Sequence, residues 1–434
     1  MKHFFPCLAL LVLLCTSCAN DLPEMASKEP TDPQKTNLDY ALACAEELIN
    51  QIDPQTRGVS RKANVQFVCN ESTRAAEQDT ILYLVNYDDN MGFALLDAEG
   101  KNGGVYAISP KGHLEFGDSV GNPVLSQFFD NVKKAASTPL IPDSDNIIVV
   151  GWAKTQYRAV AQAAPILCDR YSNWTCENIS GAGSDGAIAN VSTAAVAMAK
   201  ILAFYTHPST IGGTSINWNY ISGKSYKPTE VHKLLCALNS SSFLKDRYPA
   251  GSEDADRRIL PSLVKNALST LGLTDPYLDF SNNTAALGDP DNLYELKRVF
   301  GYPRVTHYPY IGPVIAYSNP SIPNDDTNSS FDTYQYIQYW IVDGFMDVNR
   351  FALSSSGQVI QALWPNDQTL LHCVWGLNDY LNGYYALSYG YGDLSNNAGF
   401  LENGEFEYET QYEQYHFLEI GILGGYDLNP ETQP

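Results

Sequence analysis

Residues 190–208 read Asn-Val-Ser-Thr-Ala-Ala-Val-Ala-Met-Ala-Lys-Ile-Leu-Ala-Phe-Tyr-Thr-His-Pro, and this stretch decides the fold. Ala and Leu favour helix, Ser192 and Thr193 are good N-cap residues, and Pro208 supplies a stop. Because most of the side chains are small or apolar, we expect a buried helix whose N-terminus faces other parts of the chain. The residues at that N-terminus therefore bear directly on function.

The composition describes a folded, acidic chain. Its 434 residues are too many for one ordinary core and suggest two or three domains. A hydrophobic content of 44% with 18% charged residues indicates a substantial core. The formal charge of −22 argues against nucleic acid or an anionic membrane surface as a partner, because phosphate binding needs concentrated Lys and Arg.

The N-terminus looks like a bacterial lipoprotein signal. A short basic head precedes an apolar run at 4–14, which is too short to span a bilayer, and small residues then lead to Cys18. We expect a signal peptide at 1–17, lipidation of Cys18 and a polar tether over 18–35. The mature chain would then be anchored by its lipid to the bacterial outer membrane, at the periplasmic face or the cell surface.

Six cysteines follow the expected lipid site, and their spacing matches no zinc pattern. In an exported protein the close pair Cys168 and Cys176 could form a disulfide, while buried free thiols explain the six equally well. No metal site and no cofactor is predicted from these residues.

The first third of the chain predicts a small α+β domain over 36–137. Apolar residues recur at helical spacing at both ends of this region, and turn residues separate two apolar runs between them. We expect helices at 36–50 and 122–134 and strands at 81–87, 93–97 and 104–109.

A linker rich in Pro and Asp at 138–146 leads to a larger unit at 147–426, followed by a tail at 427–434. Its front half predicts helices and its back half predicts strands, which indicates an α+β unit of two lobes with a cleft between them. The expected helices lie at 231–240, 260–271 and 292–300, and the expected strands at 147–152, 313–317, 339–342, 383–388 and 416–422.

Several stretches, in order, resemble the streptopain family of papain-clan cysteine peptidases together with its inhibitory propeptide. Residues 36–137 resemble the propeptide, and Ala-Met-Ala-Lys-Ile-Leu at 197–202 resembles the helix that starts at the catalytic Cys. Trp-Ile-Val-Asp-Gly-Phe at 340–345 resembles the strand that carries the catalytic His, and Val-Trp-Gly at 374–376 the segment beyond it. The resemblance implies a propeptide-like domain followed by a papain-like domain with a helical lobe and an antiparallel β lobe.

The resemblance also implies that the catalytic residues are missing. Counting along the matched motifs, the nucleophile position is Thr193 and the base position is Gln338, and an uncharged amide cannot act as a general base near neutral pH. The orienting Asn of the family corresponds to Val374. Asn173 stands roughly where the family places an oxyanion-hole Gln. No cysteine thiolate is available at the start of the helix.

Other residues could line the former cleft, and we considered Ser192, Trp340, His372 and Trp375. Helix capping explains Ser192 and Thr193 without a catalytic role. His372 is a candidate replacement base, but it matches a His that the family keeps at that strand position, which favours a structural role. Cys373 follows it, and alternation in a strand directs the two side chains to opposite faces.

The resulting hypothesis is an exported pseudoprotease that acts by binding a peptide or protein, or by regulating an active relative. One alternative is an active peptidase that uses an unrecognised Cys or a Ser192 or Thr193 nucleophile. Another is a surface adhesin or glycan-binding protein that uses its many Tyr residues, which a trough of exposed aromatic side chains would favour.

Overall fold

The computed structural model describes the chain in separate ranges. These are residues 36–70, 80–100, 104–116, 122–137, 151–167, 171, 174–175, 191–223, 225–239, 244, 261–273, 278–279, 290–300, 312–318, 337–353, 359–362, 368–377, 379–391, 413–416, 418, 420–424 and 426.

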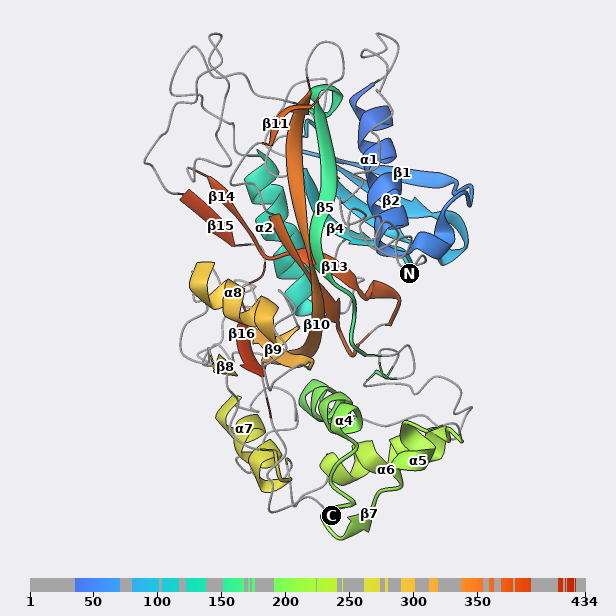
Figure 1. Cartoon of the computed structure of the whole chain (residues 1–434), viewed down its shortest axis with the longest axis vertical. Coiled ribbons are helices and arrows are strands. Elements are labelled where there is room, and N and C mark those ends of the chain that lie inside the picture. Colours follow the sequence, from blue (N-terminus) through green and yellow to red (C-terminus); the bar gives the residue numbers. More distant parts are fainter. Residues whose placement is uncertain are drawn as a thin grey trace, which may run out of the picture.

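The described part is α+β, with helices around one large antiparallel sheet (Figure 1). The helices are α1 (Asn37–Ile52), α2 (Pro123–Ser137), α4 (Thr193–Tyr205), α5 (Trp218–Ile221), α6 (Pro228–Leu238), α7 (Pro261–Thr270) and α8 (Pro290–Val299). The helices expected from sequence are confirmed within a few residues. The strand expected at 147–152 lies largely outside the described residues, and a 3-10 turn begins at Trp152.

The sheet joins strands from both ends of the chain. It contains twelve strands, of which ten follow the order β1-β2-β3-β4-β13-β12-β10-β9-β16-β8, while β5 and β11 also pair with β10. Their bounds are β1 (Ala63–Cys69), β2 (Thr80–Tyr87), β3 (Phe93–Asp97), β4 (Val105–Ser109), β5 (Thr155–Ala163), β8 (Leu278–Asp279), β9 (Val314–Ser318), β10 (Gln338–Leu353), β11 (Val359–Ala362), β12 (Gln368–Val374), β13 (Gly383–Ala386) and β16 (Gly421–Gly424).

Two small ribbons complete the strands. These are β6 (Thr210–Ile211) with β7 (Thr214–Ser215), and β14 (Ser388–Tyr391) with β15 (Glu413–His416). The strand expected over 416–422 is therefore wrong as one element, because β15 ends at His416 and β16 begins at Gly421. The two strands also pair with different partners, β14 and β9.

The first elements follow from local chemistry. Thr36 and Asp39 form a capping box at the start of α1: Thr36 Oγ1 accepts from Asp39 N at 3.3 Å, and Asp39 Oδ2 accepts from Thr36 N at 2.8 Å. Between β2 and β3, Asp89 and Asn90 adopt positive φ, as their short polar side chains allow. The hairpin expected from these turn residues is confirmed.

β10 is the long central strand, and it pairs with four others. It lies against β9 and β5 along one edge and against β12 and β11 along the other. Sequence predicted only four of its sixteen residues as strand. Figure 1 shows β10 running with β5 along the length of the molecule, with α4, α6 and α7 beyond its lower end.

A buried ion pair fixes α8 to this strand. Lys297 Nζ lies 2.7 Å from Asp347 Oδ1, and the Thr369 hydroxyl donates to the same oxygen at 2.7 Å. Such a pair is tolerated in a core only when its geometry is good and further hydrogen bonds satisfy the charges. Three elements, α8, β10 and β12, therefore meet at Asp347.

The buried hydrophobic residues form two clusters. One contains α1, α2 and α8 with residues of β2–β4, β10, β12 and β13, so the N-terminal elements share a core with the C-terminal strands. The other contains α4, α6 and α7 with Ile341 and Val374 from the end of the sheet. The linker predicted at 138–146 lies outside the described residues, and the strands on either side of it belong to one sheet.

Candidate functional site

The N-terminus of α4 lies against the start of β10. Ser192 is the N-cap, and its Oγ accepts from Ala195 N at 3.1 Å. The next hydroxyl, Thr193 Oγ1, accepts from Tyr339 N at 3.1 Å, and both residues are almost fully buried. The start of α4 and the start of β10 are therefore in direct contact.

Gln338 precedes Tyr339 and is completely buried. Among the residues that the structure describes, neither its side-chain oxygen nor its side-chain nitrogen has a hydrogen-bond partner. A buried polar group without a partner costs about 1–3 kcal/mol, so such groups call for an explanation. Gln338 therefore carries one donor group and one acceptor that nothing else in the described structure satisfies.

Val374 lies at the end of β12, opposite Ile341 of β10, and belongs to the same core cluster as α4. Just beyond it, Gly376 has φ +73°, and a Cβ there would come within 3.3 Å of Val196 Cγ1 in α4. The third matched segment thus also packs on the first turns of this helix.

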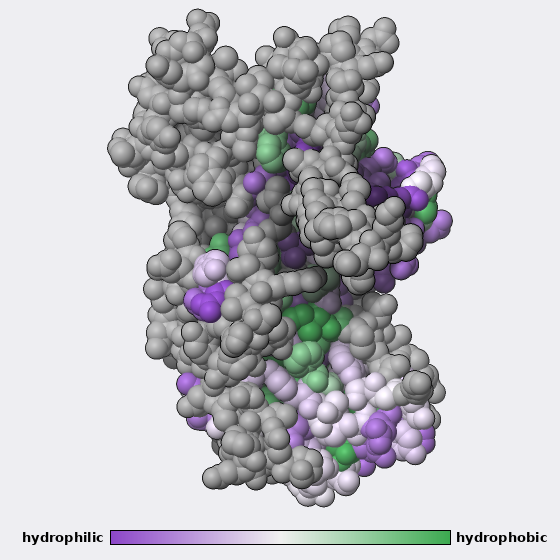
Figure 2. Space-filling view, viewed as in Figure 1, coloured by the Kyte–Doolittle hydropathy of each residue, from purple (hydrophilic) through white to green (hydrophobic). Residues whose placement is uncertain are grey.

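Trp340 and Trp375 pack against one another with ring centroids 5.0 Å apart and ring planes tilted by 35°, and both are buried. Their indoles belong to the first core cluster, together with Phe345 and Tyr385. Figure 2 shows hydrophobic side chains in the middle of one face, at the level where α4 meets the lower end of the sheet.

His372 has a carboxylate partner that sequence reasoning missed. Its Nδ1 lies 2.6 Å from Asp343 Oδ1, and Asp343 is fully buried. The register between β10 and β12 shifts between Val342 and Gly344, which leaves Asp343 as an extra residue on β10. A bulge of this kind redirects a side chain, and no periodicity in the sequence reveals it.

Asp343 also holds the chain before α4. Its Oδ2 accepts from Leu167 N at 3.0 Å, and its main-chain oxygen accepts from Ile166 N at 3.1 Å. One carboxylate therefore positions both the imidazole of His372 and the segment at 164–167. The structural role expected for His372 agrees with this geometry.

Cys373 points away from His372, as strand alternation predicts. Its side chain is fully buried in the first core cluster, with Sγ 3.6 Å from Leu371 O. Burial, reinforced by the charge of Asp343, raises the pKa of the Cys373 thiol well above its usual range. Because the thiolate is the nucleophile, Cys373 is not suited to catalysis.

Some predicted residues lie outside the described part of the chain: Asn173, Cys18, Cys168 and Cys176. The cysteines in the described ranges, Cys44, Cys69, Cys236 and Cys373, form no disulfide there. Within the described ranges no group of three His, Cys, Asp or Glu could hold a metal ion, and no helix there is long and apolar enough to cross a bilayer.

Most described Tyr residues are buried or half-buried. Among the Tyr residues whose side chains the structure describes, Tyr294 is exposed, with 47% of its surface accessible. The larger set includes Tyr106, Tyr339, Tyr384, Tyr385 and Tyr426, which are all buried. These positions form no exposed aromatic trough of the kind that glycan binding would use.

No protein family model matches the chain, and no curated protein matches it. Among solved structures, the chain is similar to a mutant fragment of prointerpain A from Prevotella intermedia, with 14% identity and a TM-score of 0.42, over 84% of this chain and 98% of that one. It is also similar to the active wild-type interpain A cysteine protease of the same organism, with 14% identity and a TM-score of 0.30, over 61% and 95%. At these values neither similarity carries a conclusion about function.

Proposed function

We propose that the protein is an exported lipoprotein that resembles a streptopain-like peptidase with its propeptide, lacks catalysis and acts by binding a peptide or protein segment. The observation that carries this proposal is the contact between Thr193 and the start of β10. In this contact the Thr193 hydroxyl accepts from the main-chain nitrogen of Tyr339, the residue after Gln338, and neither Thr193 nor Gln338 can perform acyl transfer as a Cys–His pair does.

The chemistry of the pair supports inactivity. The Thr193 hydroxyl oxygen accepts a main-chain hydrogen bond, and its neighbour Gln338 has no basic atom. Ser192 is committed to the helix cap. A hydroxyl in this position needs a neighbouring base before it can attack a carbonyl, and the side chain at the base position is a neutral amide.

Binding is supported by the unsatisfied amide of Gln338. A primary amide offers one acceptor oxygen and donor hydrogens, which is the complement of a peptide group. Gln338 has no exposed surface in the unbound protein, so an extended segment reaches its amide only after the side chains that cover it move aside. The segment would then provide hydrogen-bond partners for both side-chain atoms. The N-terminus of α4 adds a favourable potential for a carbonyl oxygen at the same place.

A cleavage assay tests the inactivity. The full chain is incubated with fluorescent casein under reducing conditions, with Thr193→Ala as the matched control. We expect no cleavage by either protein. Thiol-dependent cleavage by the unaltered chain that alkylation abolishes would instead support the alternative of an active peptidase.

A binding assay tests the second half of the proposal. Permanently unfolded, fluorescein-labelled casein is titrated with the protein, and binding is followed by fluorescence anisotropy. Gln338→Met should weaken binding roughly tenfold, the equivalent of about 1.4 kcal/mol. The control Gln162→Met changes an exposed Gln of β5 and should leave binding unchanged. Equal binding by both variants would exclude Gln338 from the site.

Lipid attachment is tested separately by growth with a labelled fatty acid. We expect label on the unaltered chain and none on Cys18→Ser. Label on both would mean that the anchor lies elsewhere.

A further inference from the structure

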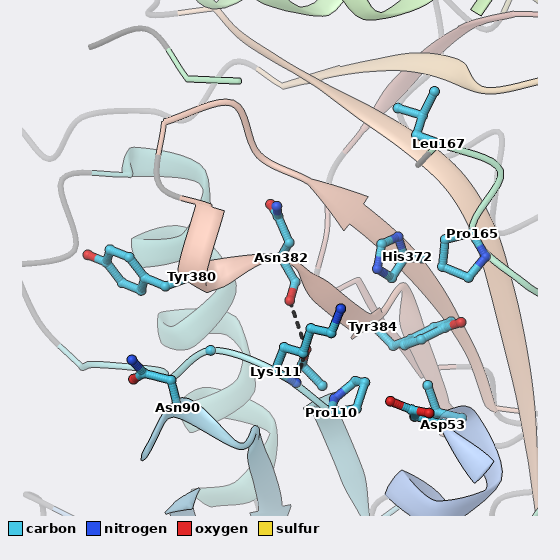
Figure 3. A pocket seen from close by; sticks show the side chains of 13 residues that line it. Asp53, Asn90, Pro110, Lys111, Pro165, Leu167, His372, Tyr380, Asn382 and Tyr384 are labelled. Atoms are coloured by element: carbon cyan, nitrogen blue, oxygen red, sulfur yellow. Dashed lines mark hydrogen bonds between the residues drawn. The ribbon is translucent and has the colours of Figure 1, made fainter. Parts of the chain in front are cut away.

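A cavity of about 630 Å³ lies between the N-terminal elements and the C-terminal strands, away from Thr193 (Figure 3). This volume is in the ordinary range for a small-molecule or short-peptide site. Its walls come from the end of α1, the turn after β4, the segment at 164–167 and the strands β12 and β13.

The walls are mostly apolar, with charged groups at a few points. Pro165, Leu167 and the ring of Tyr384 line one side. Among the polar side chains of the lining, three carry a basic or carboxylic group: His372 from β12, Lys111 from the turn after β4, and Asp53 from the end of α1. Figure 3 shows the ammonium end of Lys111 directed toward the His372 side, while the Asp53 carboxylate lies beyond Pro110.

Two contacts fix the orientation of the His372 ring in the wall of this cavity. Its Nδ1 meets the buried carboxylate of Asp343 at 2.6 Å, and its ring packs edge-on against Tyr384 with centroids 4.9 Å apart. With Nδ1 engaged, the other ring nitrogen is the one that can meet a ligand. Nε2 makes no hydrogen bond to the residues that the structure describes. A His whose second nitrogen is fixed by a carboxylate has a defined orientation.

The cavity is separate from the Thr193 position. Gly344 lies opposite His372, six residues along β10 from Gln338, which is about 20 Å at 3.3 Å per residue. None of Thr193, Gln338 and Val374 lines it. A ligand in the cavity would therefore contact different residues from a peptide at Gln338.

We propose that this cavity binds a carboxylate carried on a short apolar body of about dipeptide size, with the carboxylate between His372 Nε2 and Lys111 Nζ. Asp343 engages Nδ1, which leaves Nε2 as the ring nitrogen directed to the ligand carboxylate. The apolar walls of the cavity contact the apolar body of the ligand. Asp53 disfavours a second negative charge at the far side and suits an N–H donor there.

Two kinds of ligand carry a carboxylate on an apolar body: the C-terminus of a peptide and a free small organic acid. Calorimetric titration of the full chain with three probes separates them: N-acetyl-Leu-Leu as the free acid, the same dipeptide as its C-terminal amide, and isovalerate. We expect the dipeptide acid to bind at least tenfold more tightly than the amide. Comparable binding of isovalerate would identify a small acid as the ligand, and much weaker binding of isovalerate a peptide C-terminus.

Matched variants test the residues. Lys111→Met and His372→Gln should each weaken binding of the dipeptide acid about tenfold and leave binding of the amide unchanged. Lys62→Met is the control, since Lys62 is an exposed Lys of the same N-terminal region, paired with Asp88 on the surface. Acid and amide binding with equal affinity, no detectable binding of the acid, or wild-type affinity in Lys111→Met would each overturn the proposal.

The test is independent of the proposed peptide site. Thr193→Val should bind the dipeptide acid as tightly as the unaltered chain, and Gln338→Met should do so as well. If casein binding failed while the acid still bound, the proposed function would fall and the cavity would stand. A loss of acid binding in Thr193→Val would show that the two places are not separate.

Discussion

We expect Gln338 to lower the free energy of unfolding of the unbound protein, and this effect can be measured. Its buried amide lacks partners, and burial of such a group costs about 1–3 kcal/mol. Gln338→Met keeps a similar volume without the polar atoms, so we expect the free energy of unfolding to rise by about 1 kcal/mol or more. Urea denaturation followed by fluorescence measures this. Gln162→Met, at an exposed position, should change it by less than about 0.5 kcal/mol.

If Gln338→Met lowered the stability, the amide would have a partner in solution. The proposal that the amide of Gln338 strengthens peptide binding would then lose its support. Together with the binding assay, the variant tests whether Gln338 lowers the stability of the protein and strengthens its peptide binding. Such a compromise is common at functional sites.

The thiols provide a second test at the residue scale. Burial raises the pKa of Cys373 far more than that of Cys236, which is exposed on α6. Since alkylation needs an accessible thiolate, iodoacetamide at pH 9 should label Cys236 within minutes and Cys373 only after denaturation. Mass spectrometry of the labelled peptides reads out both. Rapid labelling of Cys373 in the native protein would mean that β12 opens locally.

At this scale the sequence predicts contacts that follow a motif and misses those that depend on register. The resemblance to the peptidase family implies that Thr193 and Gln338 lie near one another, and the Thr193 hydroxyl accepts from the main-chain nitrogen of Tyr339, the residue after Gln338. The pairing of His372 with Asp343 depends on a bulge in β10, and a one-residue irregularity leaves no trace in hydrophobic periodicity.

Among the elements, the turn after β4 is the most sensitive to substitution. Gly112 has φ +80°, and a Cβ there would lie 1.9 Å from the main-chain oxygen of Tyr380. Gly213 has the same φ and no atom within 4 Å. Gly213→Ala should cost about 1–2 kcal/mol, from the left-handed backbone alone. Gly112→Ala should cost clearly more, because a main-chain atom must also move.

Thermal or urea unfolding of the two Ala variants gives the comparison directly. The difference between them measures the close approach between the turn at 110–113 and the segment at 379–382. If the two variants lost the same stability, these two segments would not be in tight contact in solution.

Elements with strong local signals were predicted well, and those without them were not. α1 has a capping box, and the β2–β3 hairpin has turn residues with positive φ. β5 reads Thr-Gln-Tyr-Arg-Ala-Val-Ala-Gln-Ala, with few large apolar residues, and is a strand because it pairs with eight residues of β10. Tertiary pairing of this kind overrides weak local preference.

The whole molecule is organised by a pairing that sequence could not predict. Ala107 and Ile108 of β4 pair with Tyr385 and Tyr384 of β13, more than 270 residues later. The first core cluster also takes residues from both ends of the chain. A propeptide-like domain was expected from 36–137, but nothing in local patterning indicates that its sheet continues into the C-terminal strands.

This continuity predicts how the chain behaves when it is cut. A specific protease site placed within 138–150 and then cleaved should leave two fragments that elute together in size-exclusion chromatography and unfold in one transition. Separation would require the sheet to break between β4 and β13 and would expose a shared core. The uncut chain carrying the same inserted site is the control, and separate elution in native buffer would contradict a shared core.

The double pairing of β10 has a further consequence, for hydrogen–deuterium exchange. Residues 345–348 pair with β12 on one side and β5 on the other, so their amides should exchange only through global opening. β10 also carries Gln338 at its start and Asp343 beside the cavity. A ligand held at either place would slow global opening, and the deuterium uptake of one short peptide would therefore report the occupancy of both.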